Sequence, residues 1–333
     1  MKLAVVLFNL GGPDSLDAVR PFLENLFSDP AIINLPVFFR KPLAKLIASR
    51  RAAYARDIYA HIGGRSPILP ETKTQAEALE RILAYEGFDA KCFIAMRYWH
   101  PRASAVAKAV KAFAPDRIVL LPLYPQYSTT TTESSVAEWR RVYGADPKMI
   151  AVGCYAREDW FVRAHAERIA PVFAEARKHG TPRVLFSAHG LPKNISDAGD
   201  PYTHHVEQSV AATARALGLP AGTWVTTYQS RVGRLEWVKP STEDEVKRAG
   251  TDKVPLVVAP ISFVSEHSET LVELDIELKE TALHAGVPAY FRVPTVSAGE
   301  TFIAGLAGLV KAALAGTMRT CPLHADQIGR AHV

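Results

Sequence analysis

The sequence predicts a doubly wound α/β protein with two domains. Its 333 residues, 48% of them hydrophobic, can bury more core than one domain usually holds. Apolar runs bounded by turn residues alternate with helical patterns, which is typical of parallel sheets covered by helices on both faces. The two halves also resemble each other weakly, since VLFNLGGP at 6–13 has a counterpart in VLFSAHGLP at 184–192.

The apolar runs predict strands, and the segments between them predict helices. The expected strands are 3–8, 91–96, 117–123, 183–188, 223–228 and 254–263. The expected helices are 14–27, 72–86, 103–113, 159–178, 203–217, 268–285 and 299–314. Two such domains are expected to face each other across a cleft at the carboxyl ends of their strands, where ligands bind in this fold class.

The internal repeat sets the expected domain boundaries. Its copies are about 178 residues apart at the first pair of strands and about 138 at a later pair, 119–122 and 257–260. The first half therefore carries an insertion, placed at about 28–67. We expect an N-terminal domain over 1–150, a C-terminal domain over 151–315 and a tail over 316–333, with a last helix at 299–314 that could pack back on the first domain.

Composition narrows the classes of protein. The net charge of +5 comes from Lys and Arg interleaved with Asp and Glu, which argues against a nucleic-acid partner and suits an acidic ligand or a membrane surface. The apolar start of the chain is too short for a signal segment, and no stretch reaches the roughly 20 apolar residues of a spanning helix. We expect a cytoplasmic protein and leave open a peripheral contact with the inner face of the membrane.

His189 follows a predicted buried strand directly and precedes Gly190. A strand end of this kind faces the expected cleft, where an imidazole can act as a base or a metal ligand near neutral pH. A structural histidine in the core is the competing interpretation.

An acidic repeat follows the last long apolar run. Glu269, Glu273 and Glu277 recur every four residues, so a helix would carry them as one stripe. Together with His189 they offer the oxygen and nitrogen ligands that suit a divalent first-row metal. A solvated acidic helix face explains the same pattern without function.

Aromatic and basic residues form a third group. Arg97, Tyr98 and Tyr127 lie after predicted strands, and they could line a large flat ligand or belong to the core. Within the insertion, the apolar segment 35–43 precedes Arg50 and Arg51. That segment could form a lip for a greasy ligand bearing carboxylates or rest on a membrane surface, or it could be a packed helical hairpin.

Seven motifs in order resemble the ferrochelatase family over residues 1 to about 315. They are LGGP at 10–13, IGGRSP at 62–67, RYWHP at 97–101, PQYS at 125–128, SAHGLP at 187–192, YQSRVG at 228–233 and EHSETLVELD at 266–275. The resemblance implies a two-domain chelatase fold and an enzyme that inserts Fe²⁺ into a free-base porphyrin, most often protoporphyrin IX, to make haem.

The resemblance also implies roles for individual residues. His189 and Glu269 match the family's catalytic histidine and glutamate, and His267, Glu273 and Glu277 match neighbours assigned to proton transfer or metal passage. The implied metal ligands are His189, Glu269, Glu273 and Glu277. The implied porphyrin contacts, besides Tyr127, are Leu10, Arg51, Tyr59, Ser66, Arg97, Tyr98, Ser230, Trp237 and Phe263.

No resident cofactor is expected, because iron is a substrate. Some relatives hold a [2Fe-2S] cluster with several C-terminal cysteines, whereas this chain has only Cys321 there. Its three cysteines, with Cys92 and Cys154, are widely spaced and suggest neither a disulfide framework nor a zinc site. Glu266 and Tyr54 depart from residues common in the family, which leaves ligand placement near the lip open.

Two rival functions remain at this point. One is a chelatase for another tetrapyrrole or metal, such as cobalt for a corrin precursor, and the other is a porphyrin or haem carrier without catalysis. The segment 35–43 and the EHSE motif at 266–269 favour iron insertion over both. The sequence is compatible with either a monomer or a homodimer, and with either protoporphyrin IX or coproporphyrin III as substrate.

Overall fold

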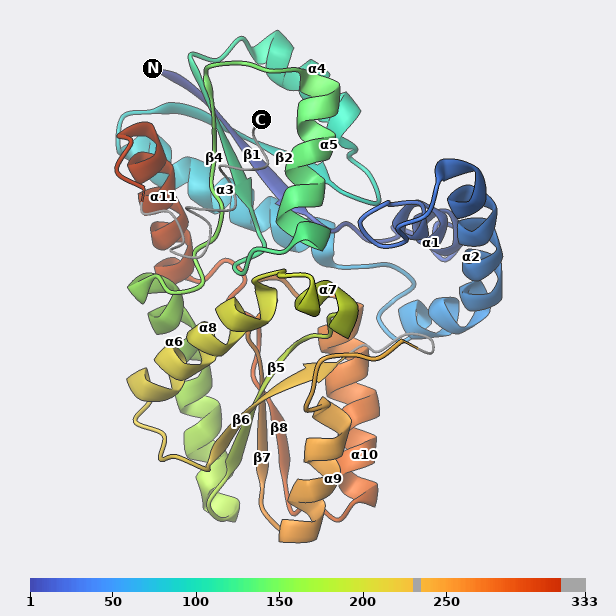
Figure 1. The fold of residues 1–333 in the computed structure, drawn as a ribbon. Coiled ribbons are helices and arrows are strands. Elements are labelled where there is room, and N and C mark those ends of the chain that lie inside the picture. The colour runs from blue at the N-terminus through green and yellow to red at the C-terminus, as the bar shows by residue number, and fades with distance from the viewer. Residues whose placement is uncertain (230–234, 319–333) are drawn as a thin grey trace. The chain divides into compact units, whose positions relative to one another are not determined.

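The computed structural model describes residues 1–229 and 235–318. The chain forms two compact units: unit 1 comprises residues 1–154 together with the chain from Ile303 onwards, and unit 2 comprises residues 155–302. Each unit holds a four-stranded parallel sheet flanked by helices (Figure 1). The doubly wound α/β prediction is therefore confirmed.

The sheet of unit 1 has the strand order β2-β1-β3-β4. Its central strand β1 pairs with β2 and β3 in parallel and is buried along almost its whole length, which explains its continuous apolar sequence. The elements are β1 (Lys2–Asn9), α1 (Val19–Phe27), α2 (Val37–Ala60), α3 (Ile68–Tyr85), β2 (Asp89–Met96), α4 (Ala103–Phe113), β3 (Arg117–Pro122), the π-helix η1 (Thr129–Glu133), α5 (Ser134–Tyr143), β4 (Met149–Ala151) and the C-terminal α11 (Glu300–Leu314).

Unit 2 repeats this topology with the order β6-β5-β7-β8. Its elements are α6 (Asp159–Ala176), the 3₁₀-helix η2 (Arg177–His179), β5 (Arg183–His189), α7 (Lys193–Asp197), α8 (Tyr202–Ala216), β6 (Trp224–Gln229), α9 (Thr242–Asp252), β7 (Leu256–Pro260), the π-helix η3 (Glu269–Glu277), α10 (Leu278–His284) and β8 (Tyr290–Arg292).

The alternation of side chains along β5 and β7 divides the core of unit 2 into two layers. Val184, Phe186 and Ala188 pack with α6 and α8, whereas Leu185 packs with α9 and α10 on the other face. Figure 1 shows the two helix pairs on opposite sides of this sheet. The candidate site lies at the carboxyl ends of β5 and β7, and it is formed by the last residue of β5 and by residues that follow β7.

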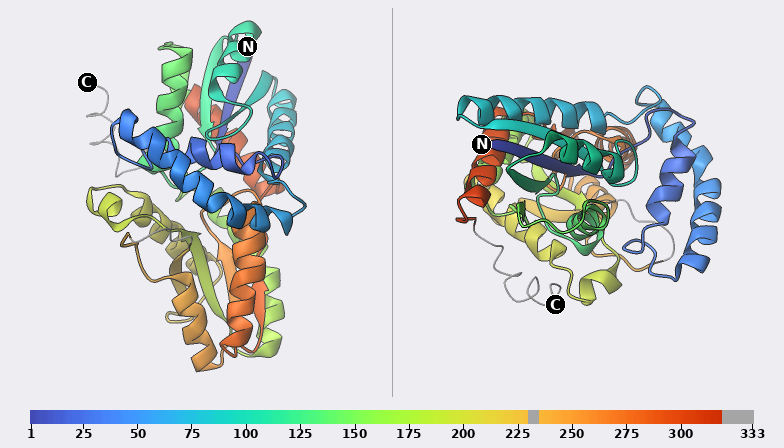
Figure 2. Two further views of the ribbon diagram at one scale, coloured as in Figure 1. Left: turned by 90° about the vertical axis from the view of Figure 1, so that its right-hand side faces the viewer. Right: turned by 90° about the horizontal axis from the view of Figure 1, so that it is seen from above.

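The predicted insertion is occupied by a long helix. α2 runs alongside α1 (Figure 2), and its buried Ala44, Ala48 and Ala52 recur every four residues, so small side chains form the contact face. Its start is apolar and open: 84% of Phe38 and 69% of Phe39 are exposed. In unit 2, the short α7 is the helix between β5 and α8.

The structure differs from the prediction at the 24-residue α2, which lies outside the predicted helices, and at several short elements. β4 and β8 have three residues each, too few for a periodic signal, and α5 and α9 also lie outside the predicted helices. The helix predicted over 268–285 begins as the π-helix η3 and becomes α-helical only at Leu278. Across residues 1–229 and 235–318, no helix is both long and apolar enough to cross a membrane.

Candidate active site

His189 is the last residue of β5, in the middle of the parallel sheet of unit 2. The turn after it is tight: a Cβ added to Gly190 would lie 2.6 Å from the carbonyl oxygen of Gln229 and 3.1 Å from the Trp237 ring. Beneath His189, the buried Ser187 hydroxyl donates to the side-chain oxygen of Gln229 on β6. The strand end is thus held by its neighbours, and the imidazole is half-exposed beyond the sheet.

Glu269 is the first residue of η3, and it meets His189 from the segment that follows β7. Its Oε2 lies 2.8 Å from His189 Nδ1. The Glu269 side chain is 16% exposed and the His189 side chain 45%. The structure therefore brings the two predicted catalytic residues into direct contact.

The pair polarises both groups. Burial opposes the charged imidazolium, but the carboxylate of Glu269, its hydrogen bond and the nearby Glu273 outweigh burial and raise the pKa of His189. Burial would raise the pKa of Glu269, yet the two histidines, His189 and His267, hold that pKa well below its ordinary value. Glu269 is consequently a carboxylate at neutral pH, and His189 is a stronger base than an isolated imidazole.

His267 and Phe263 complete the surroundings of the pair. The Nε2 atom of His267 lies 3.8 Å from Oε1 of Glu269, and its ring packs on Phe263 with centroids 4.5 Å apart. Phe263 is also 6.4 Å from the ring of His189 in an edge-on arrangement. Tyr202 donates its hydroxyl to the backbone oxygen of His189 at 3.1 Å. These contacts place His189 and His267 at the Glu269 carboxylate, with Phe263 packed against both histidine rings.

The acidic repeat is only partly drawn into this centre. Glu273 is half-buried and close enough to raise the pKa of His189, whereas Glu277 is exposed at the end of η3. Within the described part of the chain, no three His, Cys, Asp or Glu side chains are grouped so that they could hold a metal ion. The four predicted iron ligands, His189, Glu269, Glu273 and Glu277, thus do not form a ready-made metal site as the side chains lie.

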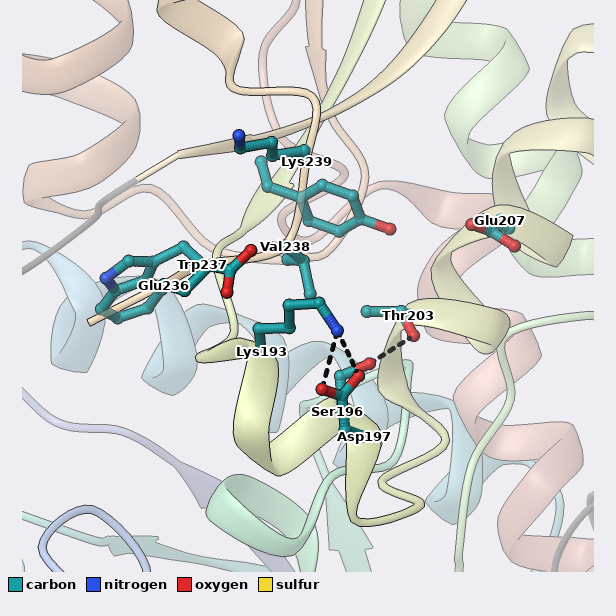
Figure 3. Close-up of a pocket in the computed structure, with 10 residues that line it drawn as sticks. Lys193, Ser196, Asp197, Thr203, Glu207, Glu236, Trp237, Val238 and Lys239 are labelled. Atoms are coloured by element: carbon teal, nitrogen blue, oxygen red, sulfur yellow. Dashed lines mark hydrogen bonds and ion pairs between the residues drawn. The ribbon is translucent and has the colours of Figure 1, made fainter.

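Trp237 lies beside the turn after His189 and lines a neighbouring cavity. Its segment pairs with the chain after β5 through a bridge between Pro192 and Trp237. The cavity has a volume of about 290 Å³ and is also lined by Tyr228, Lys239 and the ion-paired Lys193 and Asp197 (Figure 3). Neither His189 nor Glu269 is among the described residues that line it. Ser230, another predicted contact, lies outside the described residues.

The predicted porphyrin contacts of unit 1 gather around one apolar cluster. Leu10, Tyr59 and Tyr98 belong to it, together with residues of α1 and α2. Arg51 lies on α2, with its guanidinium carbon 5.9 Å from the centre of the Phe27 ring of the same cluster. Ser66 is buried against Gly12. Tyr127 stands apart from this cluster and donates its hydroxyl to Glu133 at 2.8 Å.

Asp29 is a central residue that the sequence prediction missed. Its Oδ2 accepts hydrogen bonds from the Tyr98 hydroxyl at 2.7 Å and from the Ser134 hydroxyl at 2.6 Å, and it lies 2.7 Å from a guanidinium nitrogen of Arg97. Burial first, and then the charge of Asp29, raise the pKa of Tyr98. Tyr98 is only 1% exposed, so it packs in the core with its hydroxyl satisfied by Asp29. No periodic or motif signal marks Asp29, because it lies in a loop.

Comparison with known proteins identifies the family. The model of the ferrochelatase family matches residues 2–314. The chain is 56% identical to the ferrochelatase of Phenylobacterium zucineum, over 94% of this chain and 92% of that protein, and 53% identical to the ferrochelatase of Caulobacter vibrioides, over 93% and 90%. The chain belongs to the ferrochelatase family.

Ferrochelatases are metal chelatases of the lyase class, which insert Fe²⁺ into a porphyrin in haem synthesis, and a porphyrin and Fe²⁺ are accordingly the substrates. The family match favours this activity over the two rivals raised by the sequence, a chelatase for another tetrapyrrole and a carrier without catalysis. Iron is thus a substrate of this ferrochelatase.

Solved structures agree with the fold. The chelatase SirB from Bacillus subtilis, solved with Fe³⁺, has a TM-score of 0.52 and 13% identity, over 95% of this chain and 97% of that one. A second SirB structure, from B. subtilis subspecies spizizenii in complex with cobalt, also has a TM-score of 0.52, over 94% and 95%. At such low identity these likenesses support the two-unit chelatase fold of the ferrochelatase and nothing finer.

Proposed function

We propose that this ferrochelatase acts on protoporphyrin IX and that His189 is the proton acceptor. Glu269 would orient His189 and stabilise its protonated form. The 2.8 Å contact between His189 Nδ1 and Glu269 Oε2 carries the proposal. With its Nδ1 proton donated to Glu269, a neutral His189 keeps its lone pair on Nε2. Nε2 would then be the atom that accepts a proton from the substrate.

The reaction explains why such a pair is needed. A free-base porphyrin loses two pyrrole protons when Fe²⁺ enters, and pyrrole nitrogens are very weak acids. A base next to a carboxylate accepts a proton more readily, because the imidazolium that forms is stabilised by the negative charge. His189 would take the two protons one after the other on Nε2, releasing the first before it accepts the second, and Glu269 would balance the positive charge each time. His267, 3.8 Å from Glu269, would pass protons onward.

The acidic side chains of η3 would bring the metal. We propose that Fe²⁺ passes along Glu277 and Glu273 towards Glu269 and His189, because oxygen and nitrogen ligands bind a ferrous ion without the strength of thiolates. The exposed position of Glu277 and the half-buried one of Glu273 support a graded path. Weak ligands that are spread along a helix would also let the ion go at the end of the path.

The lip, defined as residues 35–39, bears on the substrate preference. Leu35, Val37, Phe38 and Phe39 are all exposed there. Protoporphyrin IX carries two propionates and two vinyl groups, whereas coproporphyrin III carries four propionates, so an apolar lip favours the former. The same exposed side chains would allow a peripheral contact with a membrane surface, where apolar groups enter the boundary between head groups and acyl chains.

The enzyme would need no resident cofactor. We propose that it works without an iron–sulfur cluster, since Cys321 is the one cysteine in the C-terminal tail of the sequence and a cluster needs several thiolates. Cys321 itself lies outside the described residues.

A steady-state assay tests the substrate proposal. Purified enzyme is given Fe²⁺ without oxygen and either protoporphyrin IX or coproporphyrin III, and metal insertion is followed by the change in porphyrin absorption. We expect kcat/KM to be higher for protoporphyrin IX by about tenfold, the equivalent of burying one or two extra apolar groups. A higher kcat/KM for coproporphyrin III would overturn this preference.

A further inference from the structure

The last strand of unit 2 holds the helix that carries Glu269. β8 is a three-residue edge strand paired in parallel with β7, and its residues Tyr290 and Arg292 are two apart, so they point to the same face of the sheet. Both bond to η3 or to the residues just before it. The mechanism proposed above uses neither residue.

Tyr290 bonds to a backbone oxygen inside the π-helix η3. Its hydroxyl donates to the carbonyl of Leu274 at 2.6 Å. In an α-helix that carbonyl would accept the N–H of Leu278, four residues on. In this structure the Leu278 N–H goes instead to the carbonyl of Glu273, five residues back, which is the π-helical pattern. Tyr290 therefore donates to the Leu274 carbonyl at the point where the Leu278 N–H, its α-helical partner, bonds to Glu273 instead.

Arg292 binds the same helix through its side chains. Its Nε and one terminal nitrogen donate to the two oxygens of Asp275 at 2.8 and 2.6 Å, a forked pair. Its other terminal nitrogen donates to Oε1 of Glu266 at 2.7 Å. The backbone N–H of Thr295 donates to the same oxygen of Glu266 at 2.9 Å. One guanidinium thus ties the residue three places before Glu269 to the residue six places after it.

Arg292 pairs with only two of the acidic residues between 266 and 277. Between 266 and 277 there are five carboxylates, and Arg292 neutralises Glu266 and Asp275, the two outside the four-residue repeat. The Arg292 side chain is 11% exposed and that of Glu266 18%, so solvent screens this ion pair less than the pair with Asp275, which is 36% exposed. Asp275 does not belong to the repeat. The carboxylates of the repeat, Glu269, Glu273 and Glu277, are not the ones that Arg292 pairs with.

We propose that Tyr290 and Arg292 are positioning residues that set the π-helical register of η3 and so hold Glu269 against His189. If the helix returned to the α-helical register, the residues after the change would turn by about 100°, the rotation of one α-helical residue. Relative to the part of the helix that β8 holds, Glu269 at the start of η3 would then turn away from His189. The inference rests on the proposed role of Glu269 in iron insertion.

Kinetic constants of three variants test the proposal. Tyr290→Phe removes one hydroxyl, Arg292→Met removes the guanidinium, and Arg292→Lys keeps the charge without the fork. We expect Tyr290→Phe and Arg292→Met to lower kcat about tenfold and to raise KM for Fe²⁺ several-fold, with KM for porphyrin within about twofold of wild type. Arg292→Lys should fall between Arg292→Met and wild type, because an ammonium cannot make the bidentate pair.

Arg183→Met is a matched control. Arg183 starts β5, at the opposite end of that strand from His189. It is 12% exposed, and it also pairs with a carboxylate, that of Asp252 at 2.7 Å. A merely structural loss of a half-buried ion pair should therefore appear in this variant too. Its iron-insertion kinetics should stay within about twofold of wild type.

Hydrogen exchange separates the register from the chemistry. Peptides that cover 266–278 should exchange faster in Tyr290→Phe and Arg292→Met than in wild type and in Arg183→Met. Unchanged exchange in these peptides, or Fe²⁺ kinetics equal to those of Arg183→Met, would overturn the inference. Should Arg292→Met fail to fold, Tyr290→Phe and Arg292→Lys decide by the same two measurements. The proposed function fails separately, if Glu269→Gln inserts iron at the wild-type rate.

Discussion

At the scale of single residues, the account depends on two side chains from distant parts of unit 2. His189 and Glu269 are 80 residues apart in sequence and 2.8 Å apart in the structure. Both could be predicted, because each follows a buried strand of the same sheet and the strands end at one edge. The direct hydrogen bond between them could not, since it depends on the π-helical turn that begins at Glu269.

The pKa of His189 is the first prediction at this scale. Glu269 raises it, so the imidazolium persists to higher pH than in a free histidine, and the neutral base is lost as the pH falls through this raised value. In Glu269→Gln the carboxylate is gone while burial still opposes the charge, so the pKa of His189 should fall below its wild-type value. An NMR titration of the imidazole measures both values. Equal pKa values of His189 in the two proteins would show that Glu269 does not stabilise the imidazolium.

Asp29 illustrates what sequence reasoning misses. The sequence predicted Arg97 and Tyr98 as porphyrin contacts, but it gave no reason to expect a buried carboxylate between them. A loop aspartate before a proline has the composition of an ordinary turn. Only the fold shows that the chain after α1 returns to the end of β2, where Arg97 follows Met96.

Replacement of Asp29 by Asn should destabilise unit 1 strongly. The Asp29 side chain is 2% exposed and that of Arg97 is 13%, so the change leaves a cation nearly buried without its partner, at a cost of about 3 kcal/mol. Urea unfolding of the variant measures that loss. Glu175→Gln, which breaks the exposed pair with Lys178, is the control and should cost less than about 1 kcal/mol. A loss in Asp29→Asn no greater than in the control would refute the assignment.

At the scale of elements, the sequence predicted the long periodic helices and central strands best. β1, β3, β5 and β7 are buried and continuous in their apolar character, so their positions follow from the sequence. The edge strands β4 and β8 have three half-buried residues each and no such pattern. The type of η3 was also beyond reach, because its π-helical register depends on side chains of β8, a short edge strand that the sequence did not predict.

The acidic repeat of η3 supplies a prediction at this scale. If Glu273 and Glu277 guide Fe²⁺, changing both to Gln should raise KM for Fe²⁺ several-fold at low salt and leave KM for porphyrin nearly constant. The difference from wild type should shrink as salt is added, because salt screens exposed charges. Glu280→Gln, an exposed change on α10, is the control and should have no effect. Wild-type Fe²⁺ kinetics in the double variant at low salt would show that the repeat is only a solvated helix face.

At the scale of the whole molecule, the two units repeat one topology. Their sheets have the orders β2-β1-β3-β4 and β6-β5-β7-β8, and each unit has a π-helix in the segment after its third strand, η1 and η3. The two segments that resemble each other weakly, 6–13 and 184–192, contain the ends of β1 and β5, which occupy the same place in the two sheets. The additional helix α2 is the main departure from the repeat, and it lies within the insertion that the sequence placed at about 28–67, between the two pairs of similar strands.

The central claim is that His189 removes porphyrin protons so that iron can enter. The most direct test gives His189→Ala a free-base porphyrin and follows binding by fluorescence and, after Fe²⁺ is added without oxygen, insertion by absorption. We predict porphyrin binding within about threefold of wild type and less than about 1% of its insertion rate, because the loss of a general base costs 10² to 10⁴ in rate. Insertion at a tenth of the wild-type rate or more would contradict the account.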